Sequence, residues 1–156
     1  LTAYIGNLEL LTAHSKANSP YASKFGEKRF VADENPMGIT EFTLNFEGDT
    51  GEFCYKNRQG EKTIKFGMLK NIAGLFSEEN YSKEIGGIEC EGHKYKCLAS
   101  AAWVDEDTLA ILVQILDDYI GILDITVGFN GDTAVIDMKK NAEYFLTEYN
   151  GYLTAK

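Results

Sequence analysis

The stretch that decides the fold class is residues 41–55, Glu-Phe-Thr-Leu-Asn-Phe-Glu-Gly-Asp-Thr-Gly-Glu-Phe-Cys-Tyr. Phe42, Leu44 and Phe46 alternate with polar residues, so they share one face of an extended chain. The alternation resumes at Phe53 after a Gly-Asp pair, and such a pair accepts the backbone conformation of a tight turn. The stretch therefore predicts two antiparallel strands with one apolar face.

The same alternation recurs along most of the chain. We expect further strands at residues 64–68, 95–103, 108–116, 120–129 and 133–138. The connections between them are short, which favours an antiparallel meander and leaves no room for crossover helices. With a strand at residues 30–32 the count is about eight, enough to close a barrel. We therefore predict a mainly β protein, an antiparallel barrel of about eight strands.

Helical spacing occurs at two places. Ala142, Phe145, Leu146 and Tyr149 predict a short amphipathic C-terminal helix that ends before Gly151. A second helical turn is expected from Leu69, Ile72, Leu75 and Phe76, followed by a polar loop over residues 77–87.

The chain has 156 residues, a length typical of one domain. We assign residues 30–156 to the barrel and residues 1–29 to a linker or entering segment. The sequence starts with Leu1 and shows no signal peptide, so we expect a piece of a longer polypeptide. Its localisation, cytoplasmic or cell envelope, depends on the missing N-terminal part and stays open.

The formal net charge of −9 argues against nucleic acid and against anionic lipid surfaces as partners. The longest apolar run, residues 109–116, is far shorter than the roughly 20 residues that cross a bilayer. We therefore expect no membrane insertion. No Gly-rich loop follows a strand and opens a helix, so we expect no nucleotide or other cofactor.

Catalysis by a nucleophilic serine is not expected. No serine begins a Ser-x-x-Lys motif, no Gly-x-Ser-x-Gly motif occurs, and only His14 and His93 offer an imidazole base. The acidic pairs at the expected strand ends fit solvated turns better than paired catalytic carboxylates. The chain by itself is predicted to be no enzyme.

Cys90, His93 and Cys97 lie within eight residues and form a weak candidate for a metal site. A fourth ligand and the usual two-residue knuckle are missing. A disulfide that spans a hairpin is a second alternative, and ordinary packing of small apolar thiols is the third and favoured one.

The aromatic residues on the strand faces are core residues in the first place. A small barrel with bulky inward side chains can also leave a ligand cavity. On this basis the candidate ligand-binding residues are Trp103, Tyr119 and Phe66. The sequence does not distinguish a filled barrel from a hollow one.

An ordered series of motifs resembles a known module. The series is Asn35-Pro-Met-Gly-Ile-Thr-Glu-Phe-Thr-Leu-Asn-Phe-Glu-Gly-Asp, Lys65-Phe-Gly, Ala102-Trp-Val-Asp-Glu-Asp-Thr-Leu, Asp118-Tyr-Ile-Gly and Ala142-Glu-Tyr-Phe-Leu. It is similar to the C-terminal domain of bacterial beta-lactamase-related serine hydrolases of the class C and penicillin-binding-protein-like group. The resemblance implies a lipocalin-like (calycin-like) barrel attached to a catalytic domain that carries the Ser-x-x-Lys motif.

The leading hypothesis is therefore a non-catalytic accessory domain that packs on the hydrolase domain of the same polypeptide or shapes substrate access. A barrel that binds a small apolar ligand is the first alternative. A self-association module, giving a homo-oligomer, is the second.

Overall fold

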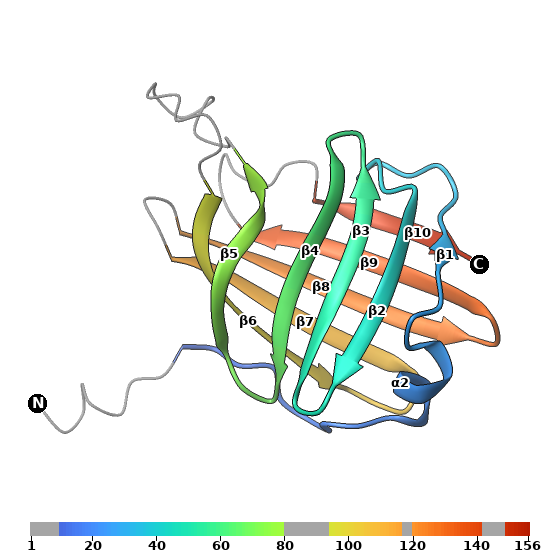
Figure 1. Cartoon of the computed structure of the whole chain (residues 1–156), viewed down its shortest axis with the longest axis horizontal. Helices are drawn as coiled ribbons and strands as arrows, with labels where there is room; N and C mark the ends of the chain where they lie inside the picture. The colour runs from blue at the N-terminus through green and yellow to red at the C-terminus, as the bar shows by residue number, and fades with distance from the viewer. Residues whose placement is uncertain (1–9, 80–93, 117–119, 142–148) are drawn as a thin grey trace, which may run out of the picture.

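The computed structural model describes residues 10–79, 94–116, 120–141 and 149–156, and within them the chain folds into strands with one short helix (Figure 1). The elements are α2 (Pro20–Phe25), β1 (Phe30–Val31), β2 (Glu41–Glu47), β3 (Thr50–Asn57), β4 (Gly60–Met68), β5 (Ile72–Glu79), β6 (Lys94–Trp103), β7 (Thr108–Leu116), β8 (Ile120–Asn130), β9 (Thr133–Asn141) and β10 (Gly151–Ala155). Among these residues no helix is long and apolar enough to cross a bilayer.

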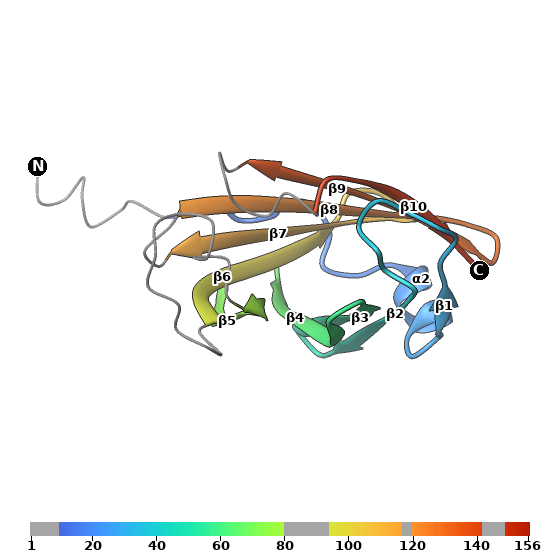
Figure 2. The ribbon, with the colours of Figure 1, turned by 90° about the horizontal axis from the view of Figure 1, so that it is seen from above.

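The strands form a nearly closed barrel with the neighbour order β1-β2-β3-β4-β6-β7-β8-β9-β10. The two ends of this order meet, because Val31 and Lys156 exchange both backbone hydrogen bonds, at N···O distances of 2.8 and 3.1 Å. Seen from above, the barrel is flattened into two layers, with β2 to β5 in one and β7 to β10 in the other (Figure 2). Pairing around the ring leaves few free strand edges.

The ring is irregular where β4 is followed by β5. β5 pairs with β6 in antiparallel fashion, and no ladder of the described strands joins β4 to β5. β4 instead pairs with β6 in parallel over two residue pairs, Gly67 with Ser100 and Met68 with Ala101. The purely antiparallel meander expected from the short connections is therefore wrong at this point, and side chains have to link the free length of β4 to β5.

The hairpin between β2 and β3 forms as the sequence predicts. Gly48 has a φ of 60° at its turn, and Gly131 has a φ of 61° at the corresponding turn between β8 and β9. Gly51 serves another purpose, because it lies opposite Phe66 and a Cβ there would come 2.5 Å from the Phe66 ring. The missing side chain lets this ring cover the strand.

Residues 10–29 pack along the barrel. Lys16 forms a two-hydrogen-bond bridge with Trp103, and the Leu11 carbonyl accepts from the Gln114 side chain at 2.7 Å. Ser19 caps the N-terminus of α2 by accepting from the Tyr21 backbone N–H, and Phe25 at the other end of this helix is buried. The segment expected to be a linker or an entering strand thus places a helix at one end of the barrel.

The mainly β barrel is confirmed, but the expected count of about eight strands is wrong because the described residues form ten. The residues expected to form a helical turn lie in β5, where pairing with β6 overrides the local spacing. The second missed strand is β10, which begins at Gly151, the residue taken as a helix stop. Residues 142–148, where the C-terminal helix was expected, lie outside the described residues.

Candidate ligand-binding interior

The end of the barrel next to α2 is filled with stacked rings. Phe25 packs on Phe30 at a centroid distance of 5.5 Å and on Phe129 at 4.9 Å. Phe30 in turn stacks on Phe42 at 5.0 Å. All four rings are at least 96% buried. Their contacts are at the usual distances for paired aromatic rings, so this end is closed by packing.

The interior also carries a polar cluster around Glu78, a β5 residue that is 2% exposed. Its Oε1 atom accepts hydrogen bonds from Asn57 Nδ2 at 2.9 Å, from the Tyr55 hydroxyl at 3.2 Å and from the Tyr149 hydroxyl. Its Oε2 atom forms an ion pair with Lys62 Nζ at 3.1 Å. We call Tyr55, Asn57, Lys62, Ser77, Glu78 and Tyr149 the Glu78 cluster.

The hydroxyl groups of the cluster also contact one another. Tyr55 Oη lies 2.8 Å from Ser77 Oγ and is within hydrogen-bond distance of Tyr149 Oη. Burial raises the pKa of Tyr55 well above its ordinary value, and the negative charge of Glu78 raises it further. The Tyr55 phenol therefore stays protonated over the whole physiological pH range.

The Glu78 cluster links β5 to two strands with which β5 has no backbone pairing. Glu78 belongs to β5, Lys62 to β4, and Tyr55 to β3. Their contacts therefore bridge the place where β4 and β5 lack a ladder. Tyr149, which precedes β10, packs edge-on against Tyr55 and Phe76.

Two of the three residues predicted to bind a ligand are brought together, and both lie in the interior. Trp103 and Phe66 are fully buried, and the ring of Phe46 contacts both, at centroid distances of 5.7 and 6.1 Å. The indole Nε1 of Trp103 has no hydrogen-bond acceptor among the described residues. Tyr119 lies outside the described residues.

The metal candidate is not assembled by the described part of the chain, in which no group of three acidic, His or Cys side chains is placed to hold a metal. Cys90 and His93 lie outside the described residues. Cys97 is buried in β6, and burial raises the pKa of its thiol to about 11. This agrees with the packing role that the sequence favoured for this thiol.

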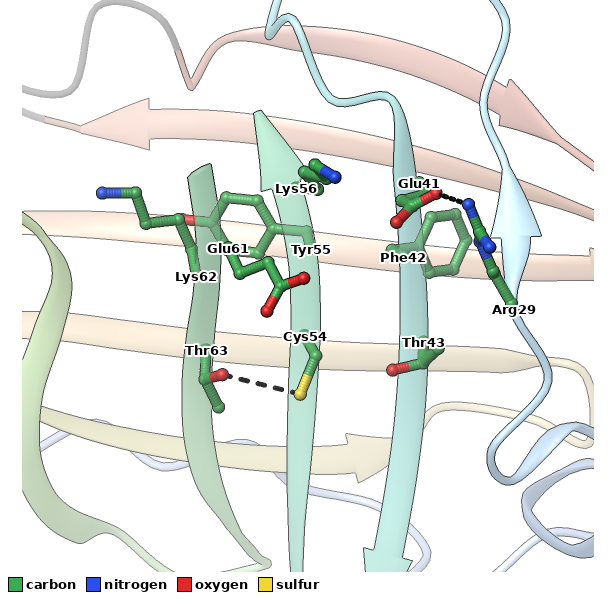
Figure 3. Close-up of a pocket in the computed structure, with 10 residues that line it drawn as sticks. All are labelled: Arg29, Glu41, Phe42, Thr43, Cys54, Tyr55, Lys56, Glu61, Lys62 and Thr63. Atoms are coloured by element: carbon green, nitrogen blue, oxygen red, sulfur yellow. Dashed lines mark hydrogen bonds and ion pairs between the residues drawn. The ribbon is translucent and has the colours of Figure 1, made fainter. Parts of the chain in front are cut away.

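A pocket of about 240 Å³ lies over β2, β3 and β4 (Figure 3). Outward-facing side chains contribute to it, including Thr63, which donates a hydrogen bond to Cys54, and Arg29, which pairs with Glu41. Its rim is charged, in contrast to the apolar interior.

Glu78 and Lys62 were not among the predicted site residues. Glu78 lay in the stretch interpreted as a polar loop, and nothing in its local sequence sets it apart from the exposed acidic residues. The alternation of β4 gives a weak signal, because Lys62 shares a strand face with Ile64 and Phe66.

No family model and no curated protein matches this chain. Among solved structures it is similar to a fatty-acid-binding protein from Manduca sexta, at a TM-score of 0.51 and 10% identity, over 84% of this chain and 97% of that one. It is also similar to a fatty-acid-binding protein from the brain of Drosophila melanogaster, at a TM-score of 0.52 and 10% identity, over 84% of this chain and 97% of that one. The likeness to lipid binding protein 8 of Caenorhabditis elegans has a TM-score of 0.52 at 8% identity, and it covers 89% of this chain and 97% of that one.

The likeness is one of fold. It confirms the calycin-like barrel that the sequence resemblance implied. The attachment to a beta-lactamase-related hydrolase stays a prediction, since none of these matches links the chain to that group.

Proposed function

We propose that this chain is a non-catalytic barrel that binds a small apolar ligand in its interior. The observation that carries the proposal is the chemistry of the interior wall, which is apolar and aromatic on both layers and, among the described residues, carries a polar cluster around Glu78. Such a wall suits an apolar molecule with a single polar group.

The structural neighbours support the same proposal. Two are fatty-acid-binding proteins and the third is a lipid binding protein, and each is covered almost completely by the likeness. The fold does not fix the ligand, so the site has to be argued from this chain's own residues.

The packed rings next to α2 leave no room for a ligand among Phe25, Phe30 and Phe42. The proposal therefore places the ligand toward the Glu78 cluster, where Tyr55, Phe76 and Tyr149 meet edge-on. The polar group of the ligand would lie at the hydroxyls and its apolar part along the aromatic wall.

The test uses Nile red, a neutral fluorescent dye, with the intact chain. Trp103 is the single tryptophan of the sequence and is buried in the interior. We expect saturable binding with energy transfer from Trp103 to the dye, and we expect a non-fluorescent apolar competitor to reverse it. Absence of saturable binding of the dye and of all apolar competitors would contradict the proposal.

A second candidate is docking of the outer face of β1, β9 and β10 onto another copy of the chain. Val31, Val135 and Tyr152 are exposed there, by 58%, 42% and 71%. Val135 and Tyr152 are diagonal neighbours across the β9–β10 pair. Sedimentation at high concentration separates this candidate from the first, and replacement of Tyr152 by Ser should abolish any dimer.

A further inference from the structure

The Glu78 cluster contains an anion supplied by the chain itself. The Glu78 carboxylate accepts hydrogen bonds from two tyrosine hydroxyls and one amide, and it pairs with the ammonium of Lys62. These are the groups with which a protein interior would hold the carboxylate of a ligand. In this barrel they are already engaged by a side chain of β5.

The charges of the cluster cancel as a pair. Glu78 is 2% exposed, and the side chain of Lys62 is 12% exposed. The buried carboxylate and the partly exposed ammonium balance, and the other members of the cluster are neutral. Any charged group that entered would therefore have no counter-charge within the cluster.

A ligand carboxylate that reached the hydroxyls of Tyr55 and Ser77 would lie beside Glu78. Two carboxylates in one buried site repel each other, and Lys62 can neutralise only one of them. A ligand ammonium would leave an excess positive charge, because Lys62 already neutralises Glu78. Both charged forms would also lose their hydration on entry.

A neutral polar group avoids these costs. The Tyr55 and Tyr149 hydroxyls donate to Glu78, while the oxygens of Tyr55 and Ser77 keep lone pairs that can accept a hydrogen bond. A ligand hydroxyl can donate to one of these oxygens without adding charge. The cluster therefore fits an alcohol better than an acid or an amine.

We infer that the barrel selects apolar ligands with a neutral hydroxyl head group and excludes fatty-acid carboxylates, because Glu78 already occupies the internal anion site. This inference rests on the proposed function and specifies its ligand class. It assigns a specificity-determining role to Glu78.

The experiment compares 1-decanol, decanoate and decylamine, which have equal chain lengths, as competitors of Nile red at neutral pH. We expect 1-decanol to displace the dye at a concentration at least tenfold below those of the two charged ligands. If decanoate displaces it at the same or a lower concentration than 1-decanol, the inference is wrong while the proposed function stands. If none of the three competes and the dye does not bind, both are overturned.

The matched pair of variants is Glu78→Gln and Glu61→Gln. Both remove one carboxylate charge, but Glu61 is exposed on the outer face of β4. Glu78→Gln should reduce the preference for 1-decanol over decanoate at least fivefold, and Glu61→Gln should leave it unchanged. An equal change in the two variants would overturn the role of Glu78. The three-ligand comparison on the unmodified chain decides the ligand class even where Glu78→Gln fails to fold.

Discussion

The two parts of the barrel interior are held together in different ways. Next to α2, rings from the helix, β1, β2 and β8 stack on one another, and the ammonium groups of Lys24 and Lys28 lie over two of these rings. Around Glu78, rings alternate with hydroxyls, an amide and an ion pair. Packing stabilises the first part, and hydrogen bonds together with one ion pair organise the second.

The difference teaches where each kind of interaction is needed. The α2 part lies where β1 pairs with β2 and β8 pairs with β9, so apolar burial suffices. The Glu78 cluster lies where β4 and β5 share no ladder. There, directional side-chain contacts take over the linking role of the missing backbone hydrogen bonds. Four predictions test this contrast.

The largest effect is expected from Phe30→Ala. Phe30 is fully buried and contacts the rings of Phe25, Phe42 and Phe129, so its removal leaves a cavity that the barrel cannot close. The free energy of unfolding should fall by about 4 kcal/mol, measured by urea denaturation. The neighbouring exposed residue provides the control, since Val31→Ala should cost less than about 0.5 kcal/mol. Equal losses in both would show that the α2 part is not held by packing.

Glu78→Gln should cost about 3 kcal/mol of unfolding free energy, because it removes the charged partner of Lys62 and a buried acceptor of several hydrogen bonds. Addition of Lys62→Met to this variant should restore much of the loss, as both charges are then absent. Denaturation of the two single variants and the double variant measures the coupling. Additive losses would mean that the ion pair does not link β4 to β5.

Tyr55→Phe should cost about 1–2 kcal/mol near neutral pH, through the lost hydroxyl contacts with Ser77, Glu78 and Tyr149. Its pH dependence is more specific. In the unfolded chain the phenol ionises near its ordinary pKa of 10.0, whereas the raised pKa keeps it protonated in the folded chain. Stability should therefore fall as the pH rises above 10, and less steeply in Tyr55→Phe. An unchanged alkaline slope in the variant would contradict this assignment.

The smallest effect concerns Cys97, in the wall formed by β6. Its thiol has a pKa raised by burial from 9.0 to about 11, so the folded chain keeps the proton that the unfolded chain releases. The contribution of Cys97 to stability is thus lost as the pH rises from 9 toward 11. At lower pH we expect the Cys97 thiol to react with a disulfide reagent more slowly than the thiol of Cys54, which is only partly buried. The measurement uses a Cys90→Ser variant so that only these two thiols react. Equal rates at the two thiols would contradict the buried placement.

Much of the fold could be predicted from the sequence because its strands carry their own pattern. The alternation in residues 41–46 and the Gly48 turn correspond to β2 and to its hairpin with β3. β5 and β10 could not be predicted in this way, since their local patterns are helical in spacing or very short. Their strand character comes from pairing with β6 and with β9, which the local patterns of residues 72–79 and 151–155 do not encode.

The candidate site divides in the same way. The sequence alone determined the mainly β class, the acidic charge and the absence of a Ser-x-x-Lys motif. It also determined the apolar strand faces that put Trp103 and Phe66 inside. These features depend only on composition and on period-two alternation. Only the tertiary structure decided that Glu78 is buried beside Lys62, Tyr55 and Tyr149. These residues lie up to 94 positions apart, and the contacts of a charged side chain depend on which strands the closing barrel brings next to it.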